Sequence, residues 1–282
     1  MKYSTSPTPM SNYPRSTSPL PAPANYSNYQ PTTASAAVKR YKYIRRLFKF
    51  NQMDFEFAAW QMVYLFVAPQ KVFRNFNYRK HTKSQFARDD PAFLVLLSVW
   101  LFLSSICFGF AMGLTSQKVA LFVLFVVFVD FIGAGLLVST IFWYVSNKYL
   151  RRDPDGPDVE WAYAFDVHIN AFFPPLSLLH CFQIVLFNNL LFHGGYLSCL
   201  VSNTFWLASI VYYLYITFLG YSSYGKIFDY DLPTLQNARI FLLPLPLLFL
   251  TYFASILMNW NLSVMLMYFY RMRIFSLEPN VG

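Results

Sequence analysis

The sequence predicts an all-α polytopic membrane protein with about five transmembrane helices, preceded by an N-terminal cytosolic region that contains an amphipathic or interfacial helix. The first observation is composition: 56% of the 282 residues are hydrophobic, 21% are aromatic and 12% are charged. Soluble domains carry about 25% charged residues. The second observation is that the apolar residues stand in long blocks without amphipathic periodicity, which indicates helices that cross a bilayer.

Changes in composition divide the chain into four segments. Residues 1–38 are rich in Ser and Pro and nearly uncharged, so they bury too little to offset chain entropy, and we expect a disordered cytosolic tail. Residues 39–90 form a basic cytosolic region, in which residues 39–88 hold twelve Lys or Arg against two acids. Residues 91–260 form the membrane domain, and residues 261–282 form a C-terminal tail.

The stretch Tyr41–Phe50 has the pattern of a basic amphipathic helix. Its four basic residues fall within an arc of about 100° on a helical wheel, and its apolar residues occupy the other side. We expect this helix to bind anionic lipid headgroups or to dock a partner protein, and a purely structural anchor is the alternative. The candidate docking residues are Lys42, Ile44, Arg45, Arg46, Leu47, Phe48 and Lys49.

The apolar blocks differ in length. Phe55–Ala68 has 14 residues, fewer than the ~17–25 that a span needs, so we interpret it as interfacial or re-entrant. The five expected spans are residues 92–112, 119–146, 169–192, 197–221 and 240–258. The second is longer than the hydrocarbon core and should tilt. Paired prolines, Pro174 with Pro175 and Pro244 with Pro246, predict kinks in the third and fifth.

The distribution of basic residues predicts the orientation. Six Lys or Arg lie within residues 71–88, just before the first span, whereas the following loop offers only Lys118. The positive-inside rule therefore places the N-terminus in the cytosol. Five spans would leave the C-terminal tail in the lumen, where Arg271 and Arg273 disagree with the rule. Either Phe55–Ala68 also crosses or the run 260–270 turns back into the membrane.

Three polar residues lie in or beside the expected spans. Asp130 lies midway along the second, and an intramembrane carboxylate is a functional candidate by default. His168 immediately precedes the third expected span, and His180 lies within it. The structural alternative is that Asp130 bonds a neighbouring helix, which Gly133 and Gly135 allow to approach closely.

The sequence contains no nucleophile motif, metal-ligand spacing or phosphate-binding glycine loop. We therefore predict a non-enzymatic membrane adaptor without a metal or cofactor. The loop 158–168 is a second candidate docking surface. One alternative is a small transporter or lipid-handling protein that uses Asp130, His168 and His180. Another is an RNA-binding membrane protein, because basic and aromatic residues alternate through residues 39–90.

Several strings resemble the Unc-fifty ("uncoordinated") family of Golgi multispanning proteins. They are RYKYIRRLFKFNQMDFEFAAWQMVYLF (40–66), RNFNYRKHTKSQFARDDPAFLVLLS (74–98), FWYVSNKYL (142–150), DVEWAYAFDVHINAFFP (158–174) and YYLYITFLGYS (212–222). The resemblance implies a five-span Golgi protein with an additional inner nuclear membrane pool. It also implies a role in delivering cell-surface receptors, particularly nicotinic acetylcholine receptors, and in recruiting large Arf guanine-nucleotide exchange factors. RNA binding has been attributed to the same family, and the resemblance carries over no catalytic residue.

Overall fold

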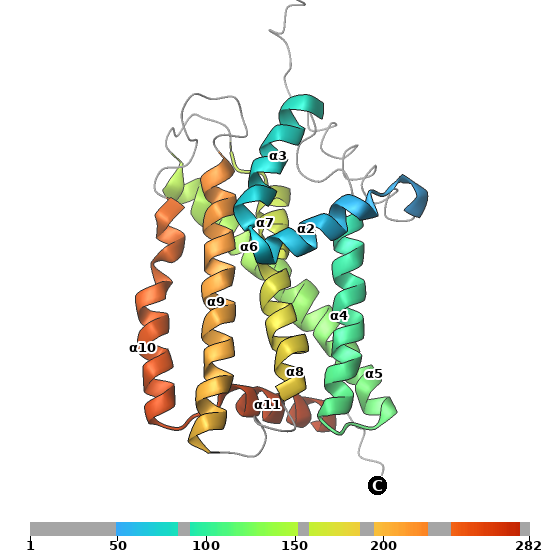
Figure 1. Ribbon diagram of the computed structural model, residues 1–282, viewed down its shortest axis with the longest axis vertical. Coiled ribbons are helices and arrows are strands. Elements are labelled where there is room, and N and C mark those ends of the chain that lie inside the picture. The colour runs from blue at the N-terminus through green and yellow to red at the C-terminus, as the bar shows by residue number, and fades with distance from the viewer. Residues whose placement is uncertain (1–48, 84–90, 152–157, 187–194, 225–237, 277–282) are drawn as a thin grey trace, which may run out of the picture. The chain divides into compact units, whose positions relative to one another are not determined.

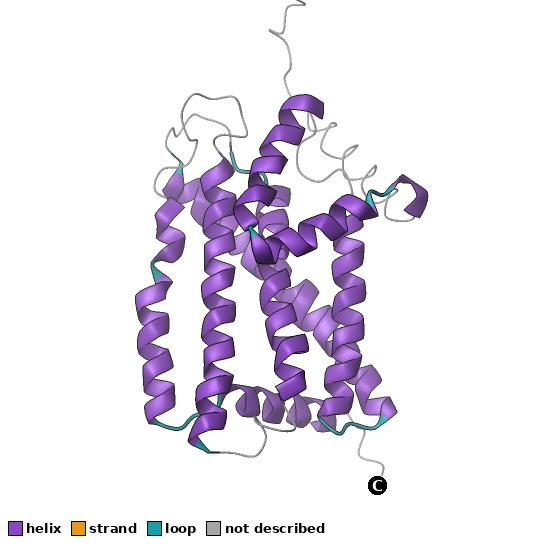
Figure 2. Cartoon of the chain, viewed as in Figure 1, coloured by secondary structure: helices purple, strands orange, loops and turns teal. Residues whose placement is uncertain are grey.

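The computed structural model describes residues 49–83, 91–151, 158–186, 195–224 and 238–276. The chain divides into two units, Met1–Tyr41 and Lys42–Gly282, and every described residue belongs to the second. Within the described ranges the chain forms helices and turns but no strand, as Figure 2 shows, which confirms the all-α fold. The expected N-terminal tail and the expected amphipathic helix, apart from Lys49 and Phe50, lie outside the described residues.

Five helical segments in this part of the chain are long and apolar enough to cross a membrane. They are Ala92–Ala111 (α4), Ser116–Leu150 (α5, η2, α6 and η3), Trp161–Leu186 (α7, η4 and α8), Tyr196–Ser223 (within α9, Tyr196–Tyr224) and Ala238–Leu257 (η7 and α10). Successive segments run in opposite directions in Figure 1. We call the end where α4 begins the entry end and the end where α10 finishes the exit end.

The second of these segments is the longest, with 35 residues. At 1.5 Å per residue it is about 50 Å long, and Figure 1 shows its α5–α6 stretch crossing the bundle obliquely. It changes between α-helical and π-helical winding along its length. Its parts are α5 (Ser116–Phe125), the π-helical η2 (Val126–Gly133), α6 (Ala134–Val145) and the π-helical η3 (Ser146–Leu150).

The third segment begins at Trp161, whereas the sequence predicted a start at residue 169. Hydropathy alone excluded the first two turns because they contain Asp166 and His168. The structure makes them helical and buries His168, so the expected loop 158–168 is largely the start of α7 (Trp161–Ser177). The π-helical η4 (Leu178–Phe182) and the short α8 (Gln183–Leu186) complete the segment.

The prolines lie in different settings within the two helices. Pro174 and Pro175 stand inside α7, and the π-helical η4 follows directly. Pro244 and Pro246 stand instead in the first turn of α10 (Pro244–Leu257), after the 3-10 segment η7 (Ala238–Leu242). Prolines at a helix start lack a donor that would have no intrahelical partner anyway. They therefore begin α10 inside the fifth membrane segment, where the winding changes from 3-10 to α-helical.

Two helices connected by Ala68 lie against the bundle at its entry end. These are α2 (Phe55–Val67) and α3 (Pro69–Lys83), preceded by the 3-10 turn η1 (Phe50–Gln52). Asp54 caps α2 because its Oδ1 accepts a hydrogen bond from the Phe57 amide (2.9 Å). In Figure 1, α2 runs across the long helices, and it packs on α4 and α7. This placement supports an interfacial rather than a spanning α2.

The last helix, α11 (Leu262–Ser276), lies across the exit end of the bundle in Figure 1 and packs on α5 and α9. A turn and a hydrogen bond fix the end of α4 beside α11. Gly113, with φ 72°, ends α4 in a left-handed turn, and Nη2 of Arg271 donates to the carbonyl of Met112 (2.7 Å). The basic charge of Arg271 therefore satisfies a helix C-terminus at the exit end.

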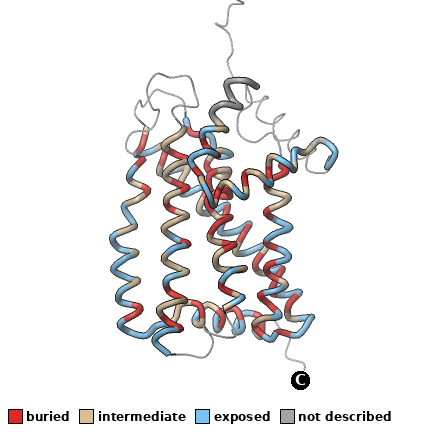
Figure 3. The backbone as a smooth tube through the Cα atoms, in the orientation of Figure 1, coloured by how far each residue is buried: buried red, intermediate tan, exposed pale blue. Residues whose placement is uncertain are grey.

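Exposed apolar side chains cover the outer surfaces of the long helices. Figure 3 shows α10 as the most exposed of these helices, and Leu247, Leu250 and Leu257 on it are 64%, 67% and 84% exposed. Such a surface is unfavourable in water but matches lipid chains. The interior contains a large apolar core that includes Leu97, Phe122 and Ile216.

Candidate functional site

A cavity of about 290 Å³ lies inside the bundle, where α4, η2, α7, η4, α9 and α11 meet. Most of its wall is apolar, and a few polar side chains converge on it. The polar lining residues are Asp130, His180, Gln183, Trp206, Ser209, Tyr213, Ser263 and Tyr270. An apolar pocket with a few convergent polar groups is the usual form of a small-molecule site.

Asp130 forms the most polar part of this wall. It lies in the π-helical η2, a form of winding that occurs frequently at functional sites. The hydroxyl of Tyr270 donates to Oδ2 of Asp130 (2.6 Å). Within the described residues Asp130 has no ion pair, so its charge depends on a neutral phenol for support.

Tyr270 is held in place by aromatic packing. Its ring meets Phe122 edge-on at 5.2 Å and Phe125 at 6.0 Å between centroids, and its side chain is 7% exposed. Burial raises the pKa of the Tyr270 phenol above its ordinary value, and the nearby Asp130 carboxylate adds to this shift. The phenol therefore stays protonated and remains a hydrogen-bond donor.

Two further polar atoms in the wall lack a partner in the described part of the chain, Nδ1 of His180 and Oγ of Ser209. Ser209 is 1% exposed. The His180 ring stacks on Phe108 with 5.1 Å between centroids. A buried polar group without a hydrogen bond lowers stability by about 1–3 kcal/mol. A ligand in the cavity that bonds these two atoms would remove this penalty.

The three polar residues predicted from the sequence are only partly brought together. Asp130 and His180 line the same cavity, whereas His168 does not line it. Nδ1 of His168 instead shares a hydrogen bond with the Tyr213 hydroxyl (2.8 Å), and Tyr213 lines the cavity. Gly135 allows this position because a Cβ there would lie 3.3 Å from Nε2 of His168.

A second polar network fixes α11 beside the cavity. Ser263 of α11 receives hydrogen bonds from Gln183, from Ser202 (2.7 Å) and from the Trp206 indole (3.0 Å). Asn203 of α9, which is 1% exposed, holds the preceding turn by accepting from the Leu262 amide (3.1 Å). Sequence reasoning missed these residues, because Ser, Gln and Asn within spans carry little signal until their partners are known.

At the entry end, the structure describes only one of the seven candidate docking residues. Lys49 is exposed there, and the others lie outside the described residues. The neighbouring helices add exposed cations: Lys71 of α3 lies 5.4 Å from the centre of the Tyr64 ring, and Arg74 is also exposed.

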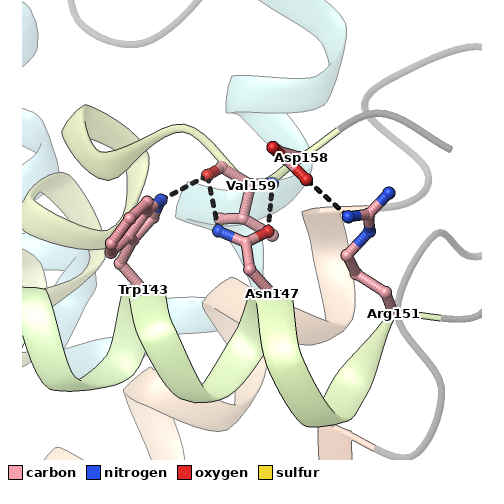
Figure 4. Close-up of polar contacts among 5 residues, drawn as sticks. All are labelled: Trp143, Asn147, Arg151, Asp158 and Val159. Atoms are coloured by element: carbon pink, nitrogen blue, oxygen red, sulfur yellow. Dashed lines mark hydrogen bonds and ion pairs between the residues drawn. The ribbon is translucent and has the colours of Figure 1, made fainter. Parts of the chain in front are cut away.

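The second candidate surface is held to the end of η3, as Figure 4 shows. Asn147 exchanges two hydrogen bonds with the Val159 backbone (2.8 and 3.1 Å), and the Trp143 indole donates to the same carbonyl (2.9 Å). Asp158 pairs with Arg151 (2.6 Å). These contacts give the segment a structural role in holding the start of α7.

No group of three His, Cys, Asp or Glu residues close enough to hold a metal ion occurs in the ranges that the structure describes. The polar groups of the cavity can bind and orient a guest through charge and hydrogen bonds.

The chain matches the model of the UNC-50 family over residues 43–271. A Drosophila melanogaster protein named Protein unc-50 homolog is 51% identical over 280 residues, which cover 98% of each chain. The Homo sapiens protein of that name is 51% identical over 241 residues, 85% of this chain and 90% of its own. The Danio rerio protein is 52% identical over 243 residues, 85% and 91% of the two chains. No solved structure is significantly similar. This chain therefore belongs to the UNC-50 family.

Proposed function

We propose that this protein is a non-enzymatic Golgi membrane protein that supports vesicle-mediated protein trafficking. Its basic entry end faces the cytosol and recruits a large Arf guanine-nucleotide exchange factor. Through this step it supports delivery of cell-surface receptors such as nicotinic acetylcholine receptors. The family membership and the resemblance stated above support this role.

The observation that carries the proposal is the fixed position of α2 and α3 on the bundle. Nε2 of Gln61 donates to Oδ1 of Asn170 (2.5 Å), a buried contact between α2 and α7. The Tyr212 hydroxyl donates to the carbonyls of Leu65 (3.0 Å) and Phe66 (2.6 Å) at the end of α2. Gln70 of α3 donates to the Tyr215 hydroxyl of α9 (2.8 Å).

These contacts support docking for an energetic reason. A peripheral protein that binds a preorganised surface loses less conformational entropy than one that must order its target. The four basic residues of the expected amphipathic helix stand shortly before α2 in the sequence. Positive charge there favours both anionic lipids and an acidic face of a partner.

The test is charge reversal of that segment. Replacing Lys42, Arg45, Arg46 and Lys49 by Glu should abolish co-purification of the exchange factor from Golgi membranes while the protein stays in the Golgi. The matched control is Arg273→Glu, which reverses an exposed charge on α11 at the exit end and should leave recovery unchanged.

Recovery of the exchange factor at the wild-type level by the fourfold variant would refute the docking proposal. Salt-sensitive crosslinking of RNA to residues 38–90, lost in the same variant, would favour the RNA-binding alternative. That alternative and the inner nuclear membrane pool stay predictions of the sequence and the resemblance.

A further inference from the structure

We propose that the cavity beside Asp130 binds a single-chain lipid amino alcohol, with the protonated nitrogen on Asp130, the hydroxyl groups on Ser209 and His180, and the chain among the apolar walls. This inference is independent of exchange-factor docking, because the cavity lies within the bundle and the docking residues precede α2.

The first argument is the charge of Asp130. A carboxylate among membrane helices normally faces a cation or a wet cavity. Tyr270 is the one hydrogen-bond donor that the structure gives Asp130 among the described residues, and a phenol supplies no compensating charge. A ligand with a protonated amine supplies it, because opposite charges attract strongly where water is scarce.

The second argument is the aromatic content of the wall. The aromatic lining residues are Phe108, Phe131, Phe172, Trp206, Tyr213 and Tyr270. Aromatic faces attract ammonium groups through their quadrupole and also pack well against hydrocarbon. A carboxylate within such a wall is suited to a ligand with a cationic head group and a hydrocarbon chain.

The third argument is the pair of polar atoms without partners. Oγ of Ser209 and Nδ1 of His180 line the same cavity as Asp130. A simple alkylamine would leave these atoms unsatisfied, whereas a hydroxyl both donates and accepts hydrogen bonds. The combination therefore favours an amine that also carries hydroxyl groups.

The volume limits how much of the ligand is enclosed. The cavity volume of about 290 Å³ is just below the ~300–1,000 Å³ found for small-molecule pockets. The head and the first part of the chain fit, and the rest of the chain extends outside the cavity. A fatty acid is disfavoured because it would place a second carboxylate beside Asp130.

The experiment uses the full-length protein in nanodiscs and a photoreactive derivative of sphingosine. Labelling should map to η2, η4 and α9, and unlabelled sphingosine should compete. The same-length alcohol and the same-length fatty acid should compete at least about tenfold more weakly. Equal competition by the alcohol would overturn the assignment of the amine to Asp130.

Two cavity variants and one control complete the test. Asp130→Asn should reduce labelling about tenfold. Ser209→Leu fills the cavity and removes an unsatisfied hydroxyl, so it should fold and also lose labelling. Ser139→Ala, whose Oγ bonds its own helix at the Gly135 carbonyl (2.7 Å), should label like the wild type. Wild-type labelling of a folded Ser209→Leu protein would overturn the proposal.

Discussion

Tyr270 of α11 donates a 2.6 Å hydrogen bond to the carboxylate of Asp130 in the π-helical η2. This contact joins the helix that lies across the exit end to the middle of the longest membrane segment. It also explains how a carboxylate is kept in the bundle without an ion pair among the described residues. A hydrogen bond to a charged group is worth about 1.5–3 kcal/mol, enough to affect both stability and the position of α11.

Tyr270→Phe should therefore lower the free energy of unfolding by about 1.5–3 kcal/mol, because it removes the only hydroxyl that bonds Asp130 in the described residues. Thermal unfolding of the detergent-solubilised protein measures this loss. The matched control is Tyr268→Phe on the same helix, where the side chain is 64% exposed. Equal effects of the two substitutions would contradict a special role for the Tyr270 contact.

The same tyrosine predicts a pH dependence. Folding raises the pKa of the Tyr270 phenol through burial and the adjacent Asp130, so above pH of about 10 the unfolded chain has lost a proton that the folded protein retains. This contribution to stability is complete below that pH and decreases as the pH rises further. Unfolding of the wild type and of Tyr270→Phe at pH 8 to 11 should show a steeper decrease for the wild type. Parallel curves would show that Tyr270 does not contribute.

The buried pair Gln61 and Asn170 should show strong coupling. Gln61→Leu leaves the Asn170 carbonyl oxygen without the Gln61 donor in a buried site, which should cost about 1–3 kcal/mol. Replacing both residues by Leu should cost less than the sum of the two single substitutions. A double-mutant cycle on the unfolding free energy measures the coupling, and additive effects would mean that this contact does not fix α2 on the bundle.

The orientation can be tested by glycosylation in microsomes. An acceptor sequence engineered after Asn280 should be glycosylated, because five crossings place the two termini on opposite sides of the membrane. The native Asn25 sequon should stay unmodified in the cytosol. Protease protection supplies the control, since residues 1–38 should be digested in intact vesicles. An unmodified C-terminal acceptor that is also digested would place both termini in the cytosol, and would show that α2 or α11 crosses.

The prediction of a membrane-spanning helical protein succeeded where the signal was a long apolar block. The segment Ala92–Ala111 was predicted within one residue of its observed end, because composition alone decides whether such a helix is stable in lipid. The start of α7 was missed by eight residues, because tertiary contacts bury His168 and make its polarity acceptable. Pro244 and Pro246 lie within the fifth apolar segment, as expected, and the winding there changes from 3-10 to α-helical.

The sequence by itself determined the all-α class, the number of long apolar helices and the family, because each of these depends on which residues follow one another. Only the tertiary structure decided that Asp130 and His180 share a cavity, that His168 reaches it through Tyr213, and that Tyr270 supports Asp130. The physical reason is that hydropathy sums the transfer energies of neighbours along the chain. A hydrogen bond such as that between Tyr270 and Asp130, 140 positions apart, depends instead on how helices pack.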